Sequence, residues 1–431
     1  MKDFGRSDDP RVQAQLDRLA ALSVPQGRLG LETTRALMER LGNPHRRLPP
    51  VFHVAGTNGK GSTCAFLRAM LEADGKRVHV TTSPHLVRYN ERIRIAGELV
   101  SDGELAGLLE EVLNAGEDLG PSFFEVTVAA AFLAFSRVPA DACVVEVGLG
   151  GRFDATNVLE AETLAACGIA ALGIDHERFL LSPEDGVPEA PLARIAFEKA
   201  GIAKRGVPLV TLGPTMSAAA EIMNVAEKVG SPLFMEGVDW QVFAEAERFH
   251  VVAGGTQITL PMPGMPGHHQ IANAALAAAM IRYQDRVEVS PDAMAEGVRT
   301  AHWPARLQAL SSGPLVGERE VWLDGGHNPN AAEMLARHFS GQQVHLVIGM
   351  IEGKDPAGFL RALGRIPASI TVVPVPAHEW QAAERFGPEA RFATDVPSAL
   401  GTLPDDGLPI LIAGSLYLAG EVLRLNKELP D

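Results

Sequence analysis

The amino-acid sequence predicts an α/β protein of two domains, each with a parallel sheet covered by helices. Short runs rich in β-branched residues alternate with helical patterns almost throughout the chain, as parallel sheets require. A chain of 431 residues is too long for one ordinary core. Hydrophobic residues make up 46% and charged residues 21%, which indicates a globular protein rather than a disordered one.

The composition also excludes several classes of function. The net charge of −15 argues against a general nucleic-acid binder, although it leaves ATP binding open. The three cysteines, Cys64, Cys143 and Cys167, lack the spacing of a zinc site, and their odd number argues against a disulfide framework. The first residues are polar, so we expect no signal peptide. No run of about 18 apolar residues occurs, so we expect no membrane span. We therefore expect a cytoplasmic protein that binds neither nucleic acid nor membrane.

The first predicted domain covers residues 1–299. Its predicted strands lie within 49–56, 77–83, 141–148 and 163–176, with short antiparallel strands in 241–264. Its predicted helices lie within 62–75, 123–138, 192–203, 213–230 and 268–281. The stretch 298–308, "VRTAHWPARLQ", has little periodicity and predicts a linker, which places the boundary near Thr300.

The second predicted domain covers residues 300–431. Strand patterns at 320–326, 344–350, 369–376 and 409–415 alternate with helical ones in this part of the chain. Four such alternations in a short segment predict a small Rossmann-like domain.

A glycine-rich stretch, "HVAGTNGKGST", follows the first predicted strand. The common nucleotide loop reads G-x-x-x-x-G-K-[ST], but Val54 stands here where its first glycine belongs. The remaining pattern is still suited to phosphate: Lys60 can reach the β- and γ-phosphates, and the hydroxyls of Ser62 and Thr63 can face phosphate or Mg²⁺. The alternative is a glycine-rich turn with a solvated lysine.

Three polar side chains stand at or near the ends of predicted strands: Ser83, Glu146 and His176. The carboxyl ends of parallel strands meet at one edge of a sheet, so these side chains could converge on a divalent cation. Mg²⁺ prefers oxygen ligands, which makes the histidine unusual and Mn²⁺ a second candidate. The alternative is that Glu146 caps a loop and His176 satisfies a turn.

Ten stretches of the chain, in order, resemble the folylpolyglutamate synthase and dihydrofolate synthase family of the Mur ligase superfamily. They are "HVAGTNGKGST", "TSPHLVRYNERIRI", "FFEVTVAAAF", "EVGLGGRFDATN", "GIDH", "IAFEKAGI", "HHQIANAALAA", "PARLQ", "DGGHNPN" and "GSLYLAGEV". The resemblance extends over nearly the whole chain. It implies an N-terminal Mur-ligase-type P-loop ATPase domain at 1–299 and a C-terminal Rossmann-like ligase domain at 300–431.

The resemblance further implies an ATP-dependent ligase that adds L-glutamate to dihydropteroate and to folate polyglutamate tails through an acyl phosphate. ATP is then a substrate, one or two Mg²⁺ ions are cofactors, a monovalent cation is a further candidate, and we expect a monomer. A Mur-type peptidoglycan ligase is one alternative, but it should carry a domain for the UDP-sugar ahead of the loop. A non-ligase P-loop ATPase is the other, and it leaves Lys199, Arg306 and Asp324 without a role.

Site residues are implied by the same resemblance. Those expected at ATP are Thr57, Asn58, Gly59, Lys60, Gly61, Ser62, Asn273, Arg306 and Asp324. The metal ligands are Ser83, Glu146, His176 and a carbamylated Lys199, while Lys60, Lys199 and His327 are the catalytic candidates. An ammonium beside Mg²⁺ loses its proton readily, and a neutral amine can react with CO₂. Sequence alone favours a surface Lys199 paired with a neighbour such as Glu198.

The pterin substrate is expected at three short segments and one arginine. They are Gly27, Arg28, Leu29 and Gly30; Ser122, Phe123, Phe124 and Glu125; Phe153, Asp154 and Ala155; and Arg88, with Arg92 as a further candidate for a substrate carboxylate. Phe124 and Phe153 could bracket a flat ring, and Asp154 could accept from its amino groups. The alternative is that these aromatic residues belong to the core.

Two departures from the family pattern stand out. Ala305 replaces the glycine usual in "PGRLQ". The stretch 177–191, "ERFLLSPEDGVPEAP", which separates His176 from Lys199, is longer and richer in proline than expected.

Overall fold

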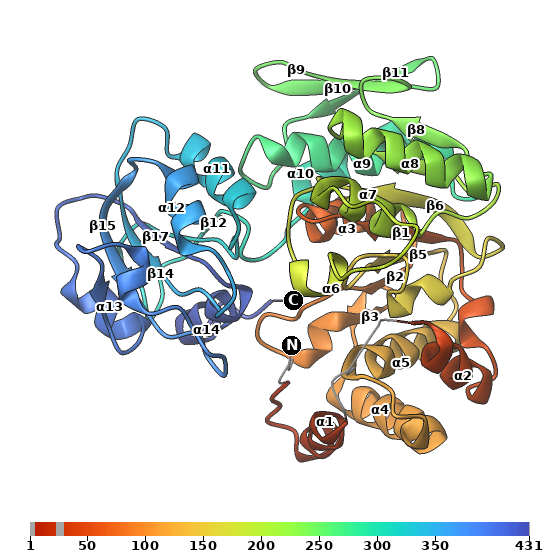
Figure 1. Ribbon diagram of the computed structural model, residues 1–431, viewed down its shortest axis with the longest axis horizontal. Coiled ribbons are helices and arrows are strands. Elements are labelled where there is room, and N and C mark those ends of the chain that lie inside the picture. The colour runs from red at the N-terminus through yellow and green to blue at the C-terminus, as the bar shows by residue number, and fades with distance from the viewer. Residues whose placement is uncertain (1–4, 23–29, 431) are drawn as a thin grey trace. The chain divides into compact units, whose positions relative to one another are not determined.

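The computed structural model describes residues 5–22 and 30–430, and the chain forms two compact units (Figure 1). The first unit extends to His302, apart from the short segments 85–87 and 265–269, which group with the second unit. The second unit contains these segments and the chain from Trp303 onward. Among the described residues, no helix has the length and apolar character needed to span a membrane.

The first unit is built on an eight-stranded sheet in the order β4-β3-β2-β5-β1-β6-β7-β8. Its strands are β1 (Val51–Ala55), β2 (Val78–Thr81), β3 (Ile93–Ile95), β4 (Glu98–Leu99), β5 (Ala142–Glu146), β6 (Leu164–Ile169), β7 (Leu209–Thr211) and β8 (Leu233–Met235). All neighbours are parallel except β3 against β2 and β4 against β3. Every residue of β1 and β5 is buried, as expected for central strands covered on both faces.

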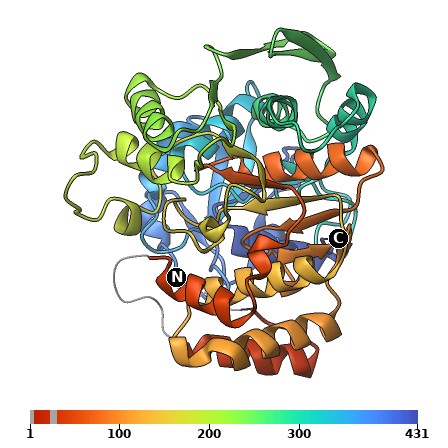
Figure 2. The same cartoon turned by 90° about the vertical axis from the view of Figure 1, so that its right-hand side faces the viewer.

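Helices cover both faces of this sheet (Figure 2). One face packs against α1 (Pro10–Ala21), α2 (Glu32–Arg40), α4 (Asp102–Gly116), α5 (Phe123–Arg137), α7 (Pro191–Ala200) and α8 (Met216–Val229). The other is covered by α3 (Lys60–Ala73), α9 (His269–Tyr283) and α10 (Pro291–Thr300). Short helices complete the unit: α6 (Glu177–Leu180), η1 (Pro44–Arg46), η2 (Tyr89–Arg92), η3 (Glu117–Leu119) and η4 (Ala155–Val158).

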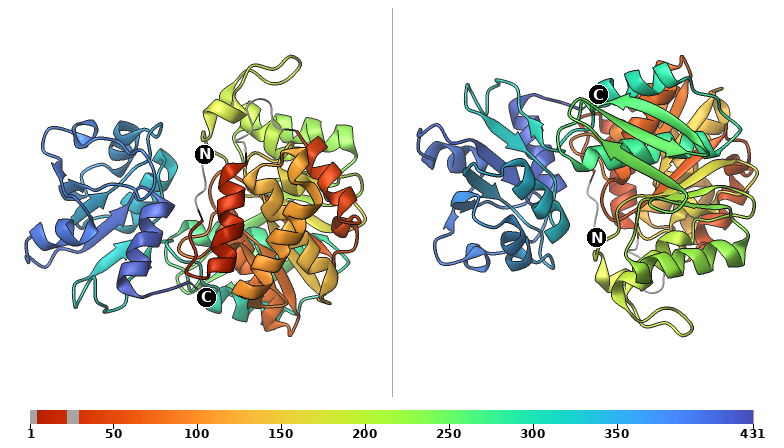
Figure 3. Two further views of the ribbon diagram at one scale, coloured as in Figure 1. Left: turned by 90° about the horizontal axis from the view of Figure 1, so that it is seen from below. Right: turned by 90° about the horizontal axis from the view of Figure 1, so that it is seen from above.

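A small antiparallel sheet follows the main sheet, as the sequence predicted (Figure 3). It contains β9 (Trp240–Ala244), β10 (Arg248–Ala253) and β11 (Thr256–Pro261), in the order β11-β10-β9. The linker predicted at 298–308 is shorter than expected. Ser290 caps α10, and the helix continues to Thr300. It extends this far because Val298, in its last turn, is buried in the first unit.

The second unit is a six-stranded sheet in the order β12-β13-β17-β14-β15-β16. The strands are β12 (Gln308–Ala309), β13 (Val321–Leu323), β14 (Val344–Ile348), β15 (Pro367–Val372), β16 (Arg391–Phe392) and β17 (Ile410–Ala413), and only β12 is antiparallel to its neighbour. The helices are α11 (Pro329–His338), α12 (Pro356–Leu363), α13 (Val396–Thr402), α14 (Leu416–Asn426) and η5 (Ala383–Phe386). The four predicted strand–helix alternations are confirmed, with an apolar core on each face of the sheet.

Candidate functional site

The glycine-rich loop joins β1 to α3 at the carboxyl edge of the main sheet. The backbone N–H groups of Thr57 and Asn58 donate to the carbonyl oxygen of Ala171, at 2.9 and 3.1 Å. The Thr57 hydroxyl donates to the carbonyl oxygen of Gly173 at 2.8 Å. The loop is therefore fastened to the segment that follows β6.

Gly59 occupies a position that only glycine fits well. Its φ of +84° is in the left-handed region, and a Cβ there would collide with Oδ1 of Asn273 on α9. Asn273 is buried, and its Nδ2 donates to Oε1 of Gln270 at 3.0 Å. The structure thus brings the loop and Asn273 together. Sequence reasoning missed Gln270, although its spacing of three from Asn273 on a predicted helix was the available signal.

Two lysines converge on one backbone oxygen of this loop. The carbonyl oxygen of Gly56 accepts from Nζ of Lys60 at 3.1 Å and from Nζ of Lys199 at 2.9 Å. Burial, and then the nearby charge of Lys60, lower the pKa of Lys199 to about 7. The alternative of a surface Lys199 paired with Glu198 is wrong, because Lys199 is only 4% exposed and Glu198 pairs with two arginines.

The start of α3 carries further groups suited to phosphate. Gly61, Ser62 and Thr63 are all buried in the first turn of the helix. The Thr63 hydroxyl has no hydrogen-bond partner among the described residues. The first N–H groups of a helix also lack partners within the helix, so this turn offers donors to an anion.

Two of the predicted metal ligands lie side by side. Glu146 is the last residue of β5 and is buried, and its Oε2 accepts from the backbone N–H of Ser83 at 3.1 Å. A carboxylate and a hydroxyl are ligands that suit Mg²⁺. Within the described ranges, no three His, Cys, Asp or Glu side chains are arranged to hold a metal ion. A cation here would therefore need a donor of another type besides Glu146.

His176 does not end a strand, and this prediction is wrong. The strand β6 stops at Ile169, because the segment after it serves as the anchor for the glycine-rich loop. His176 precedes α6 with a φ of +53°, and its Nε2 lies 3.8 Å from Oδ2 of Asp175. Asp175 also acts on Lys199 electrostatically. Sequence reasoning missed Asp175, even though it stands beside the histidine in the motif "GIDH".

Three predicted residues gather at the carboxyl end of β13 in the second unit. The Asp324 carboxylate accepts from the backbone N–H of Leu307 at 2.8 Å and of Gly326 at 2.7 Å. A Cβ on Gly325 would lie 3.3 Å from Nη1 of Arg306, so the guanidinium passes over that glycine. Nδ1 of His327 donates to the carbonyl oxygen of Gly325 at 3.2 Å. Arg306, Asp324 and His327 are therefore brought together.

The predicted pterin segment at the start of α5 has structural roles. Ser122 caps the helix, and Oε2 of Glu125 accepts from its backbone N–H at 2.7 Å. Oε1 of Glu125 accepts from the Thr34 hydroxyl at 2.8 Å, which ties α2 to α5. The Phe123 ring packs edge-on against Tyr89, with centroids 5.5 Å apart. The Phe124 ring covers Gly148, where a Cβ would collide with it.

The segment 153–155 is also engaged within the chain. The buried Asp154 carboxylate accepts from the backbone N–H groups of Leu149 at 2.8 Å and Thr156 at 3.0 Å. Burial is the largest influence on this carboxyl and raises the pKa of Asp154. Phe153 stacks on the Arg152 guanidinium at 4.1 Å, and Ala155 is buried.

The remaining pterin candidates are spread over other elements. Gly27, Arg28 and Leu29 lie outside the described residues, whereas Gly30 is half-buried just before α2. Arg88 precedes η2, and its backbone N–H donates to Oε1 of Glu91 at 2.6 Å. Arg92 is buried, with its guanidinium 5.4 Å from the Phe123 ring.

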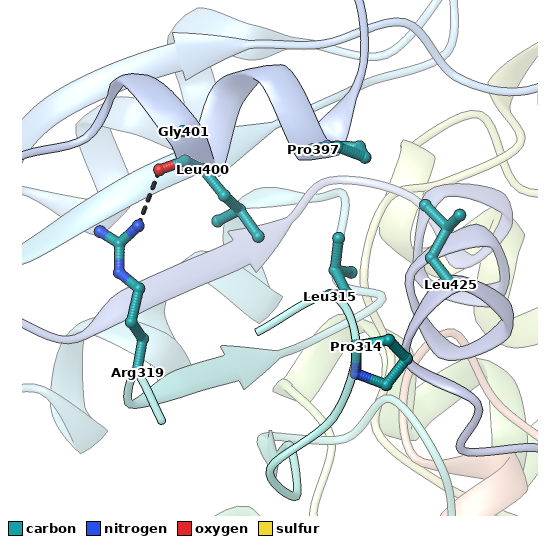
Figure 4. Close-up of a pocket in the computed structure, with 7 residues that line it drawn as sticks. All are labelled: Pro314, Leu315, Arg319, Pro397, Leu400, Gly401 and Leu425. Carbon is teal, nitrogen blue, oxygen red and sulfur yellow. Dashed lines mark hydrogen bonds between the residues drawn. The ribbon is translucent and has the colours of Figure 1, made fainter. Parts of the chain in front are cut away.

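A cavity of about 370 Å³ lies in the second unit (Figure 4). Its lining residues are Pro314, Leu315, Arg319, Pro397, Leu400, Gly401 and Leu425. The guanidinium of Arg319 donates to the carbonyl oxygen of Leu400 at 2.7 Å. None of the predicted site residues lines this cavity, so it is separate from the candidate site.

Comparison with known proteins decides the family. The chain is 35% identical over 378 residues to the dihydrofolate synthase/folylpolyglutamate synthase of Escherichia coli, covering 86% of this chain and 82% of that protein. It is 32% identical to the Bacillus subtilis protein of the same name, covering 92% and 95%. The chain belongs to the dihydrofolate synthase/folylpolyglutamate synthase family. No protein-family model matches the chain.

Solved structures agree with this membership. An E. coli member of the family in complex with DHPP and ADP is 30% identical, with a TM-score of 0.84 and coverage of 97% of this chain and 98% of that one. A bifunctional member with Mn, AMPPNP and L-glutamate bound is 32% identical, with a TM-score of 0.83 and coverage of 96% and 97%. The fold class and the family resemblance predicted from the sequence are confirmed. The predicted enzyme class, ATP-dependent ligation of glutamate to folates, is confirmed, and the alternatives of a peptidoglycan ligase and a non-ligase ATPase are not supported.

Proposed function

We propose that this protein joins L-glutamate to dihydropteroate, and also to the glutamate tail of folates, at the expense of ATP. The observation that carries the proposal is the convergence of Lys60 and Lys199 on the carbonyl oxygen of Gly56, at 3.1 and 2.9 Å. The half-buried Lys60 does not need the buried Lys199 beside it for a structural role. Two cationic or proton-exchanging groups at a glycine-rich helix start suit a triphosphate and a metal ion.

The reaction has two steps. The substrate carboxylate attacks the γ-phosphorus of ATP, and ADP leaves with the electrons of the broken P–O bond. The amine of glutamate then attacks the carbonyl carbon of the acyl phosphate, the C–O bond to phosphate breaks, phosphate leaves with that electron pair, and the nitrogen gives up a proton. Lys60 and the first turn of α3 neutralise the charge that develops on the phosphates, while the loop holds them in place.

A divalent cation would be held by Glu146, Ser83, His176 and Lys199. It supplies positive charge opposite the phosphates when bound. Glu146 is the one carboxylate of that predicted set, so a carbamate on Lys199 would add a second anionic oxygen ligand of the kind that Mg²⁺ prefers. We propose that Lys199 is carbamylated. The neutral amine attacks the carbon of CO₂, a C–N bond forms while one C=O π pair moves onto oxygen, and the nitrogen releases a proton to solvent, which leaves an anionic carbamate.

The lowered pKa of Lys199, about 7, supports this step. At neutral pH about half of the amine is then uncharged, whereas almost none would be at an ordinary lysine pKa. The hydrogen bond to Gly56 holds the nitrogen beside the loop.

The other predicted residues take parts that their geometry allows. Asn273 lies against Gly59 and is proposed to contact the nucleotide. Arg306 is proposed for the γ-phosphate, because a guanidinium is permanently charged and offers paired donors. Asp324 is proposed for the ribose hydroxyls, and His327 for a position near the phosphates. Residues 1–299 then form the ATP-binding domain and 300–431 the ligase domain.

For the pterin, the intrachain contacts favour a supporting part for Glu125 and Asp154 over direct recognition. Phe124, Phe153 and Arg88 stay as proposed contacts. We further propose a cytoplasmic monomer, with a monovalent cation as an additional candidate at the site.

The test is release of phosphate from ATP. We expect release only when dihydropteroate and glutamate are both present, and none from Lys60→Ala protein. Lys228→Ala, which removes an exposed lysine of α8, serves as the matched control and should retain full activity. Release that needs neither acceptor, or that persists in the Lys60→Ala protein, would contradict the proposal.

A further inference from the structure

The segment 177–190, here called the strap, runs from His176 to the start of α7 (Figure 1). Its first residues form α6, and it returns to the chain at Pro191. It contains the unexpectedly long and proline-rich part of the sequence. Two of its contacts with the rest of the first unit are here called anchors.

The first anchor is a cluster of four charged side chains, here called the ion quartet: Arg152, Glu184, Arg194 and Glu198. Glu184, which belongs to the strap, accepts from Arg152 at 2.6 and 3.0 Å and from Arg194 at 2.9 Å. Glu198 accepts from the same two arginines, at 2.7 and 3.0 Å from Arg152 and at 2.9 Å from Arg194. The four side chains are between 6% and 21% exposed. The quartet is therefore largely buried, its two carboxylates balance its two guanidinium groups in charge, and each carboxylate accepts from both arginines.

Arg152 is the centre of the quartet. Its guanidinium lies 4.1 Å from the Phe153 ring and 4.9 Å from the Phe197 ring. Its backbone N–H donates to the carbonyl oxygen of Glu198 at 2.7 Å. The loop that carries Arg152, the helix α7 and the strap are thus joined at one point.

The second anchor is apolar. Leu180, the last residue of α6, is 4% exposed. A Cβ on Gly150, whose φ is +69°, would lie only 2.9 Å from Cδ2 of Leu180. The leucine therefore packs directly on the backbone of the loop that leads to Arg152.

Sequence position links these anchors to the candidate metal site. His176 immediately precedes the strap, and Lys199 immediately follows Glu198 of the quartet. A buried ion cluster adds little net stability, because removing charges from water costs about as much as their attraction returns. In some proteins such a cluster instead fixes the geometry of the groups around it.

We propose that Glu184 is a positioning residue, which holds His176 and Lys199 in the arrangement that binds the metal–nucleotide complex. The inference rests on the proposed function, because it assumes that these two residues face the cation. Residues that orient metal ligands typically change metal affinity about 10–100-fold when they are replaced. Glu184 should have an effect of that size although it is not itself a ligand.

The test measures Mn²⁺ affinity by electron paramagnetic resonance, with the full chain and a non-hydrolysable ATP analogue. We expect Glu184→Gln to weaken Mn²⁺ binding about 10–100-fold, because its amide group turns a donor toward a guanidinium. Asp185→Asn, the exposed neighbour on the strap, is the matched control and should bind as the wild type does. Equal Mn²⁺ affinity in Glu184→Gln and wild type, or equal weakening by Asp185→Asn, overturns the proposal.

A second variant covers the case in which Glu184→Gln does not fold. Leu180→Ala loosens the strap at its other anchor without touching a charge, and it should also weaken Mn²⁺ binding. If Leu180→Ala binds like the wild type in that case, the proposal is wrong. Failure of the wild type to bind Mn²⁺ with the analogue would instead remove the proposed function, and the inference with it. If the wild type binds Mn²⁺ with the analogue and the variants bind it equally well, the inference about Glu184 is wrong and the proposed function stands.

Discussion

Replacing Lys199 with methionine should change how stability depends on pH. Burial and the charge of Lys60 lower the pKa of Lys199 from 10.5 to about 7 in the folded chain. In the unfolded chain the amine returns to its ordinary value, so between about pH 7 and 10 the unfolded state binds one proton more. Stability therefore rises with pH through this window, and the full cost of the buried amine is present below it.

The size of the effect follows from one proton. Each pH unit inside the window contributes about 1.4 kcal/mol, so the total between pH 7 and 10 is about 4 kcal/mol. Methionine has nearly the same length and carries no charge, so the Lys199→Met protein should lack this gain. Titrating groups that do not interact with Lys199 cancel in the difference between the two proteins.

The assay is urea unfolding of both proteins at several pH values, without nucleotide and in CO₂-free buffer, so that the amine stays unmodified. The difference in free energy of unfolding, wild type minus variant, should rise steadily with pH. Lys228→Met, at an exposed position of α8, should give a flat difference and serves as the control. A flat difference for Lys199→Met as well would refute the reasoning.

Three further predictions follow from other contacts. Gly59→Ala should weaken ADP binding about tenfold or more by calorimetry, because its Cβ meets Asn273. Gly75→Ala is the control: its φ of +76° is similar, but the space around it is open, so ADP affinity should stay as in the wild type. Unchanged ADP affinity in Gly59→Ala would contradict the expectation. Ser122→Ala should lower the free energy of unfolding by about 1 kcal/mol, because Ser122 caps α5; an unchanged urea midpoint would speak against it. Removal of divalent cations with EDTA should stop ligation, and Mg²⁺ or Mn²⁺ should restore it; turnover that survives EDTA would exclude the metal requirement.

Much of the fold could be predicted because it is written in local patterns. The central strands are continuous apolar runs, and β1 and α3 are separated by a glycine-rich turn that reads clearly in the sequence. The four alternations of the second unit have the same local character. The end of β6 could not be placed, because the apolar residues continue past Ile169 while the pairing does not. Periodicity reports burial, and burial does not stop where a strand loses its partner.

In the candidate site too, residues in local sequence patterns could be predicted, whereas contacts between residues distant in the chain could not. The glycine-rich loop pattern finds Lys60, and a topological argument finds Glu146, which ends β5. The pairing of Glu198 with Arg152 joins residues 46 positions apart, and the hydrogen bond of Lys199 to Gly56 joins residues 143 positions apart. No spacing rule links such residues. The capping role of Glu125 could have been anticipated, since Ser122 and Glu125 have the spacing of a capping box before an apolar run.

The attachment of the glycine-rich loop to Ala171 has a consequence for how a ligand is received. Two amide donors are already committed inside the protein, so an incoming anion must be met by the others at the helix start. The loop is therefore held in place by contacts within the chain before a ligand binds. Because of these contacts, less conformational freedom is lost on binding than in a loop without them.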